Sequence, residues 1–159
     1  MNVTVIAMGR LKESYLTDAC GEYLKRLSAF GKAEVIELNP VKLPDEPSEK
    51  QIAAALDAEA DKILEKVPKG AFLCAMCVEG KQQSSERLAK TLEGAATGGC
   101  GSAVFVIGSS YGLSDRVKQA AALRLSMSEM TFPHQLARVM LLEQIYRAFT
   151  ITAGKKYHK

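Results

Sequence analysis

The chain has 159 residues, 47% hydrophobic and 25% charged, with a formal net charge of +3 at pH 7. This length suits one domain with a sizeable core, and the composition excludes a disordered chain. No apolar run reaches the roughly 18 residues of a membrane span, and the first residues lack the basic start of a signal peptide, so we expect a cytoplasmic protein. The mild positive charge permits a nucleic-acid partner without requiring one.

Strand and helix patterns alternate along the whole chain, with no internal repeat or domain boundary. In chain order we expect a strand at residues 1–8, a helix at 11–30, a strand at 33–38, a helix at 48–66, a strand at 71–78, a helix at 84–94, a strand at 102–107, a short helix at 114–121, a strand at 123–127 and a long helix at 133–150. Ser48 and Gln51 have the spacing of a capping box, and Pro133 suits a first helical position.

This alternation of apolar strands and helices predicts an α/β fold, with a parallel sheet covered by helices on both faces. Ligands bind such sheets beyond the carboxyl ends of the strands. Late in the chain, loops leave such ends after Val78, after Ile107 and after Met127. We therefore expect one pocket built from these three loops.

The cysteines Cys74 and Cys77 form a C-x-x-C pair, which is typical of a redox site or of half a metal site. They lie within an apolar strand pattern, where residues three apart point to opposite faces. A redox pair also requires a helix N-terminus, which is absent here. We interpret both cysteines as small buried hydrophobic residues.

The last helix has one apolar face and one polar face. The apolar face carries Leu136, Val139, Met140, Leu142, Ile145, Tyr146 and Phe149. The polar face carries Gln135, Arg138, Glu143, Gln144 and Arg147. Because the apolar surface exceeds what one sheet face covers, we expect a symmetric homodimer that uses this helix.

The loop at residues 107–113 (Ile-Gly-Ser-Ser-Tyr-Gly-Leu) contains glycines that allow a ligand close to the backbone, although an ordinary turn explains it equally well. It lacks the Gly-Lys-Ser/Thr sequence that ends a P-loop, and it does not fit the G-x-G-x-x-G motif of dinucleotide-binding sites. His134 and His158 have no second histidine or cysteine at ligand spacing, so no metal site is expected. We interpret His134 as a polar group at a helix start.

Four motifs together identify a family. They occupy residues 105–113, residues 125–135 (Leu-Ser-Met-Ser-Glu-Met-Thr-Phe-Pro-His-Gln), residues 143–149 and the ending Tyr157-His158-Lys159. They resemble the RlmH family of SPOUT-class methyltransferases, which methylate N3 of a pseudouridine in bacterial 23S ribosomal RNA. The likeness extends over the whole chain, residues 1–159, as a single methyltransferase domain.

The resemblance implies a C-terminal trefoil knot, S-adenosylmethionine as methyl donor, a homodimer, and an assembled ribosome or large subunit as substrate. The cofactor site that it implies consists of Met76, Gly108, Met127, Ser128, Glu129, Met130, Thr131 and Phe132. Met76 stands where relatives carry leucine, which conserves the volume. The rival interpretation is a non-catalytic RNA- or nucleotide-binding module of the same fold.

The C-terminal tail, residues 155–159, supplies the expected RNA contacts. Its lysines neutralise phosphates and Tyr157 stacks on an unpaired base, so we expect the tail to add little to the core. The proton on the target nitrogen requires a base, for which His158, Glu129 and Glu143 are candidates. We favour His158, acting across the dimer. Arg147 is either the group that stabilises an ionised base or an ordinary surface charge.

Overall fold

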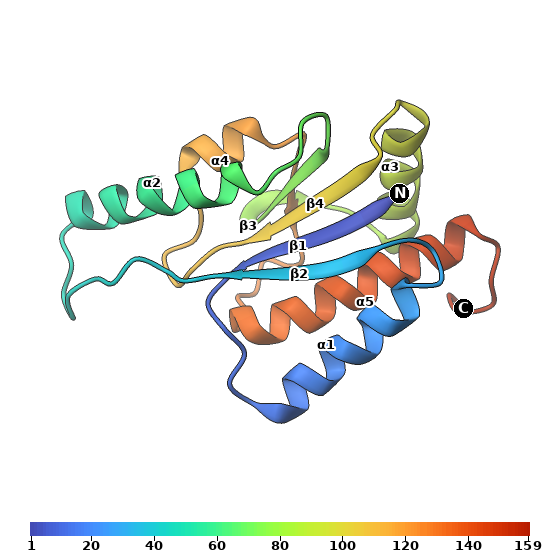
Figure 1. Ribbon diagram of the computed structural model, residues 1–159, viewed down its shortest axis with the longest axis horizontal. Coiled ribbons are helices and arrows are strands. Elements are labelled where there is room, and N and C mark those ends of the chain that lie inside the picture. Colours follow the sequence, from blue (N-terminus) through green and yellow to red (C-terminus); the bar gives the residue numbers. More distant parts are fainter.

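The computed structural model describes residues 1–159, and its five strands and five helices alternate as the sequence predicts (Figure 1). The elements are β1 (Asn2–Met8), α1 (Ser14–Leu27), β2 (Ala33–Leu38), α2 (Glu49–Glu65), β3 (Phe72–Gln82), α3 (Ser85–Thr97), β4 (Ser102–Ile107), α4 (Asp115–Ala120), β5 (Leu123–Ser126) and α5 (His134–Thr152).

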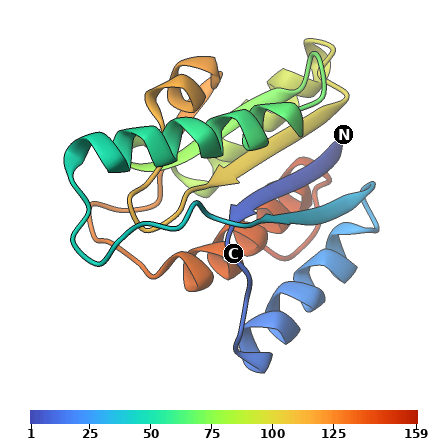
Figure 2. The same cartoon turned by 60° about the vertical axis from the view of Figure 1, so that its left-hand side comes forward.

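The strands form one sheet in the order β2-β1-β4-β3-β5, and every neighbouring pair is parallel. Helices α1, α3 and α5 cover one face, and α2 and α4 cover the other (Figures 1 and 2). The predicted parallel α/β sheet is therefore confirmed. Parallel neighbours require crossover connections, which the helices supply.

Strand β4 shows why the central strands are continuous apolar runs. Phe105 and Ile107 pack among α1, α3 and α5, whereas Val104 and Val106 pack under α2 and α4. Side chains alternate between the faces of a strand, so a strand covered on both sides must be apolar at every position.

The prediction of two buried cysteines is confirmed for Cys74, whereas Cys77 is only half-buried. Cys74 is buried in the core beside α1, α3 and α5, whereas its neighbour Ala75 packs on the opposite face. All four cysteines are free thiols. Burial raises the pKa of Cys74, with a smaller contribution from Cys77, so the thiolate that would react is disfavoured.

Strand β3 is longer than predicted because it bulges. Leu125 of β5 is paired with both Met76 and Lys81 of β3, so the intervening segment leaves the ladder. At Gly80 an added Cβ would lie 2.8 Å from backbone carbons of Arg124 and Leu125. Only glycine fits, because real Cβ atoms do not approach backbone this closely.

Helices α2, α3 and α4 each begin after a serine whose hydroxyl caps the helix, whereas α1 and α5 have no side-chain cap. The capping box at Ser48 is present: its hydroxyl accepts from the Gln51 N–H at 3.2 Å, and the Gln51 side chain accepts from the Ser48 N–H at 2.8 Å. Pro133 is the N-cap of α5 rather than its first helical residue. Helix α1 begins at Ser14, later than predicted.

The polar face assigned to the last helix is wrong at Arg138. This side chain is 3% exposed and donates hydrogen bonds of 3.0 Å to the Glu37 carboxylate and to the Gly9 carbonyl. Because α5 lies against the sheet between α1 and α3, a position that spacing alone marks as polar is enclosed. The Nε atom of Arg138 is buried without a partner. No helix combines the length and apolar character needed to cross a lipid bilayer.

Candidate active site

The carboxyl ends of β3, β4 and β5 enclose a cavity of about 480 Å³, which we call the donor cavity. Its walls come from the bulge of β3, from the glycine loop (residues 108–113) and from the segment between β5 and α5. The three loops that the sequence singled out therefore do converge. Seven of the expected cofactor residues line the cavity: Met76, Gly108, Met127, Ser128, Met130, Thr131 and Phe132. Glu129 is exposed and does not line it.

The glycine loop closes tightly on itself. The Gly112 N–H donates to the Ser109 carbonyl at 2.8 Å, and Gly112 has a φ of +85°, which favours glycine. An added Cβ at Gly108 would lie 2.3 Å from the Gly112 carbonyl oxygen. A side chain at Gly108 would thus open the loop itself rather than fill the cavity.

The segment after β5 is held by serine hydroxyl groups. Ser126 Oγ donates to the Ser128 carbonyl at 2.9 Å, and Ser128 Oγ accepts from the Met130 N–H at 3.0 Å. These local bonds turn the chain from the strand toward α5. They leave Met130 71% exposed at the cavity mouth.

Titratable side chains border the donor cavity on two sides. Lys118 forms an ion pair with Glu79, and the hydrogen bond from Lys118 holds the pKa of Glu79 below its usual value. On the other side burial, and then the charge of Arg138, lowers the pKa of His134. His134, the first residue of α5, is therefore a neutral wall of the cavity at neutral pH.

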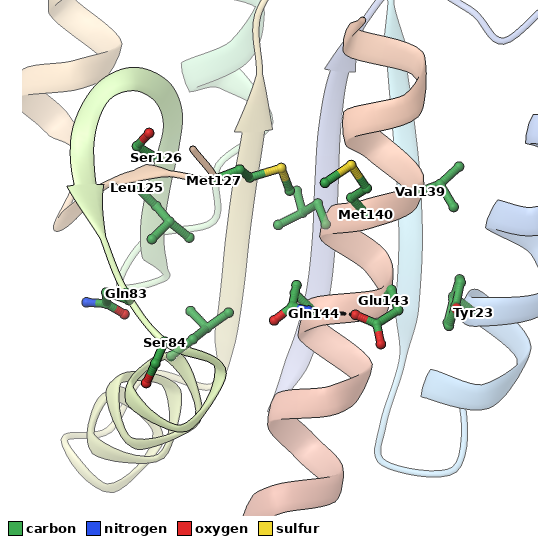
Figure 3. Close-up of a pocket in the computed structure, with 12 residues that line it drawn as sticks. Tyr23, Gln83, Ser84, Leu125, Ser126, Met127, Val139, Met140, Glu143 and Gln144 are labelled. Carbon is green, nitrogen blue, oxygen red and sulfur yellow. Dashed lines mark hydrogen bonds between the residues drawn. The ribbon is translucent and has the colours of Figure 1, made fainter. Parts of the chain in front are cut away.

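A second cavity, of about 410 Å³, lies beside α5 (Figure 3). It shares Leu125, Ser126 and Met127 with the donor cavity, and the thioether ends of Met127 and Met140 point toward each other in Figure 3. Its polar wall includes Glu143, whose carboxylate accepts from the Gln144 amide at 2.7 Å.

Glu143 also connects this cavity to the C-terminal tail. The Tyr157 hydroxyl donates to its carboxylate at 3.1 Å, and Arg147 donates through Nε at 3.0 Å. The Arg147 guanidinium lies over the Tyr157 ring, 4.7 Å from its centroid. The Tyr157 ring also meets Tyr146 edge-on, with centroids 4.8 Å apart. The tail thus packs on α5, contrary to the expectation that it adds little to the core.

His158 completes this group. Its Nδ1 lies 3.3 Å from Arg147 NH1, and its Nε2 lies 2.7 Å from Glu86 Oε1 on α3. Because a guanidinium only donates, Nδ1 must accept, so the neutral ring carries its proton on Nε2 and donates to Glu86. The three predicted catalytic residues, Arg147, Tyr157 and His158, therefore lie together.

Two carboxylates complete the cluster, and sequence reasoning treated them differently. Glu143 is a base candidate that the sequence places on the polar face of the last helix, yet its side chain is only 17% exposed. The spacing of four residues between Glu143 and Arg147 is the feature of the sequence that indicates this ion pair. Glu86 was missed, since 72 residues separate it from His158.

The pKa values in this cluster distinguish the roles of the side chains. Burial, followed by hydrogen bonds with Tyr23 and Glu143, raises the pKa of Tyr157 to about 12. Tyr157 therefore stays protonated at neutral pH and acts as a donor. Hydrogen bonds from its own backbone N–H, from Ser84 and from His158 lower the pKa of Glu86 to about 2. No group of three or more His, Cys, Asp or Glu side chains is arranged to hold a metal ion.

Comparisons with known proteins agree with this arrangement. The family described as predicted SPOUT methyltransferases matches residues 1–158. Two relatives named ribosomal RNA large subunit methyltransferase H, from Bacillus pumilus and Bacillus thuringiensis, are each 48% identical over the full length of both chains. A probable methylase family protein from Haemophilus influenzae shares the fold, with a TM-score of 0.53 and 13% identity over 99% of this chain and 70% of its own. The chain therefore belongs to the SPOUT methyltransferase family.

Proposed function

We propose that the protein transfers a methyl group from S-adenosylmethionine to N3 of a pseudouridine in 23S ribosomal RNA. The observation that carries the proposal is the convergence of three strand-end loops on one cavity, at the residues expected to hold this donor. Relatives 48% identical over the whole chain are named for methylation of large-subunit ribosomal RNA. Membership in a methyltransferase family weighs against the rival, non-catalytic binding module.

The donor fits the chemistry of the cavity. S-adenosylmethionine supplies a methyl group bonded to a positively charged sulfur atom. The glycine loop and the segment at residues 127–132 present backbone groups and small side chains, which suit an adenosine and an amino-acid moiety. Met76, Met127 and Phe132 add an apolar wall. Holding donor and acceptor in line is the main catalytic contribution expected of such residues.

The RNA nitrogen must lose a proton, and we assign its removal to His158. Tyr157 remains protonated, so it serves as a hydrogen-bond donor and stacking surface instead of a base. In the present arrangement both His158 nitrogens have partners, Arg147 and Glu86. His158 becomes a proton acceptor when bound RNA displaces Arg147 from Nδ1, and the freed guanidinium then stabilises the ionised base.

The proposal includes a homodimer acting in the cytoplasm, where assembled ribosomal particles are found. Leu136 on α5 is 42% exposed and Tyr15 on α1 is 69% exposed, which supports an interface on these helices. Across such an interface the tail of one protomer would serve the donor cavity of its partner. Lys155, Lys156 and Lys159 are exposed and available to phosphates. The C-terminal knot stays a prediction of the family resemblance.

Two measurements test the proposal. Calorimetry with S-adenosylmethionine should detect binding to the purified protein, and its product S-adenosylhomocysteine should compete. Mass spectrometry of ribosomal RNA from a deletion strain should show one missing methyl group on a pseudouridine, which the purified enzyme restores on ribosomal particles. Donor binding with no change in the RNA would point to another acceptor, and no donor binding would overturn the proposal.

A further inference from the structure

Glu59 on α2 is a buried carboxylate for which the proposed reaction has no use. Its residue is 3% exposed, and none of the ion pairs of the chain includes it. Both of its oxygens accept hydrogen bonds instead. Oε1 accepts from the Val41 N–H at 3.0 Å, and Oε2 accepts from the Ser109 hydroxyl at 3.1 Å. Burying a carboxylate without a cation is unfavourable, so these two bonds are what hold it in place.

These two bonds join segments far apart in the sequence. Val41 belongs to the proline-containing loop after β2, and Ser109 belongs to the glycine loop that lines the donor cavity. The bond to Glu59 is the only side-chain hydrogen bond made by residues 108–113. Apart from its backbone hydrogen bonds, the glycine loop is therefore held by the one hydrogen bond from Ser109 to Glu59.

Helix α2 fixes the far end of the same loop as well. Arg116 on α4 forms ion pairs of 2.8 Å with Asp57 and with Asp61 of α2. The glycine loop runs between β4 and α4, so α2 holds it near its start through Glu59 and beyond its end through Arg116. A loop held in this way loses little conformational freedom when a ligand binds.

We infer that Glu59 is a positioning residue for the methyl donor, which fixes the glycine loop through Ser109 in the shape that binds it. The inference rests on the proposed function of the donor cavity. Glu59 touches neither donor nor RNA. It orients the Ser109 hydroxyl toward α2, which keeps the hydroxyl proton out of the cavity and preorganises the backbone groups of the loop.

Variants of the two partners test this role. We expect Ser109→Ala and Glu59→Leu each to raise the dissociation constant for S-adenosylmethionine about tenfold, while kcat at saturating donor stays within about twofold. The double variant should bind no more weakly than the weaker single variant, since both remove one connection. Glu59→Gln should bind within about threefold of wild type, because its amide can accept from Val41 and donate to Ser109.

Glu65→Leu is the matched control, because Glu65 is exposed on the same helix and forms no side-chain hydrogen bond. It should bind the donor like wild type. Hydrogen exchange of the ligand-free protein provides a readout that needs no activity: the amide of Gly112 should exchange about tenfold faster in Ser109→Ala. Because Ser109→Ala changes only a hydroxyl group, it decides the question even where Glu59→Leu fails to fold.

Wild-type affinity and wild-type exchange in Ser109→Ala would overturn the inference. Additive losses in the double variant would overturn it too, since Ser109 would then contact the donor independently of Glu59. If the wild-type protein bound no S-adenosylmethionine, the proposed function would fail, whereas the exchange measurement would still decide whether Glu59 fixes the loop.

Discussion

The hydroxyl group of Tyr157 lies 3.1 Å from the carboxylate of Glu143, so the last residues of the chain are fastened to the middle of α5. Tyr157 and Arg147 share this carboxylate, and Arg147 in turn faces His158. The tail is therefore held in a defined place before any RNA arrives. Its placement beside the second cavity leads to the first prediction.

Removal of residues 157–159 should abolish methylation and leave donor affinity unchanged. The tail residues contact Glu143, Arg147 and Glu86, none of which lines the donor cavity. Single-turnover methylation of ribosomal particles and calorimetry with S-adenosylmethionine measure the two effects separately. Tyr157→Phe is the milder comparison, because it keeps the ring and loses only the hydrogen bonds of the hydroxyl group to Glu143 and Tyr23. Full methylation by the truncated enzyme would contradict the role of the tail.

Acid should weaken the contact between α3 and the tail. The pKa of Glu86 falls from 4.5 to about 2 in the folded protein, chiefly through its own backbone N–H and Ser84, and then through His158. A carboxyl group with a depressed folded pKa stabilises the fold above its unfolded pKa, and this contribution is lost as the pH falls from about 4.5 to 2. Unfolding measured across this window should depend less on pH in Glu86→Gln than in wild type. Identical pH profiles would contradict the prediction.

The buried pair of Arg138 and Glu37 should respond unequally to loss of either partner. Glu37→Gln leaves a guanidinium that is 3% exposed without its counter-charge, and should cost about 3 kcal/mol of unfolding free energy. Arg138→Met removes the buried charge and leaves a carboxylate that is 37% exposed, so the loss should be smaller, about 1–2 kcal/mol. Chemical denaturation measures the unfolding free energy of both variants. A larger loss in Arg138→Met than in Glu37→Gln would show that the Arg138 guanidinium is better solvated than its burial indicates.

Gly80→Ala should destabilise the protein at the bulge where β3 passes β5. The new methyl group would lie 2.8 Å from the backbone of Arg124 and Leu125, and relieving this contact should cost about 1–3 kcal/mol. Gly94→Ala is the control, because Gly94 lies within α3 with open space around it. That change should stabilise the protein by about 0.5–1 kcal/mol. Equal melting temperatures for the two variants would refute the prediction.

The protein should sediment as a dimer at micromolar concentration. Leu136→Asp places a charge on the exposed apolar part of α5 and should yield monomers, because a buried uncompensated charge opposes association. Ala53→Asp on the exposed surface of α2 should leave the dimer intact. A wild-type monomer at this concentration would exclude the proposed interface.

The elements whose signals are local could be predicted from the sequence. The capping box at Ser48, the continuous apolar strands and the three glycine- or serine-rich strand ends each depend on a few neighbouring residues. The sequence also predicted that the loops after β3, β4 and β5 converge, since the carboxyl ends of parallel strands share one edge of a sheet.

Features that depend on partners distant in the sequence could not be predicted. Arg138 meets Glu37 across 101 residues, and Glu59 meets Ser109 across 50 residues. Arg138 and Glu59 each occur in a helix, where a charged residue is normally exposed. The bulge of β3 likewise appears only once β5 lies beside it, because the requirement for glycine at residue 80 comes from the backbone of Arg124 and Leu125.

The order of strands in the sheet has a consequence for synthesis. While the polypeptide emerges from the ribosome, β1 can pair with β2 early, but its other edge waits for β4, about 100 residues later. The donor cavity waits longer still, since residues of β5, of the segment after it and of the start of α5 line it. A nascent chain thus exposes an apolar strand edge for most of its translation and gains the capacity to hold a methyl donor only with its final helix. Prematurely terminated chains would be targets for chaperones and proteases rather than partly active enzymes.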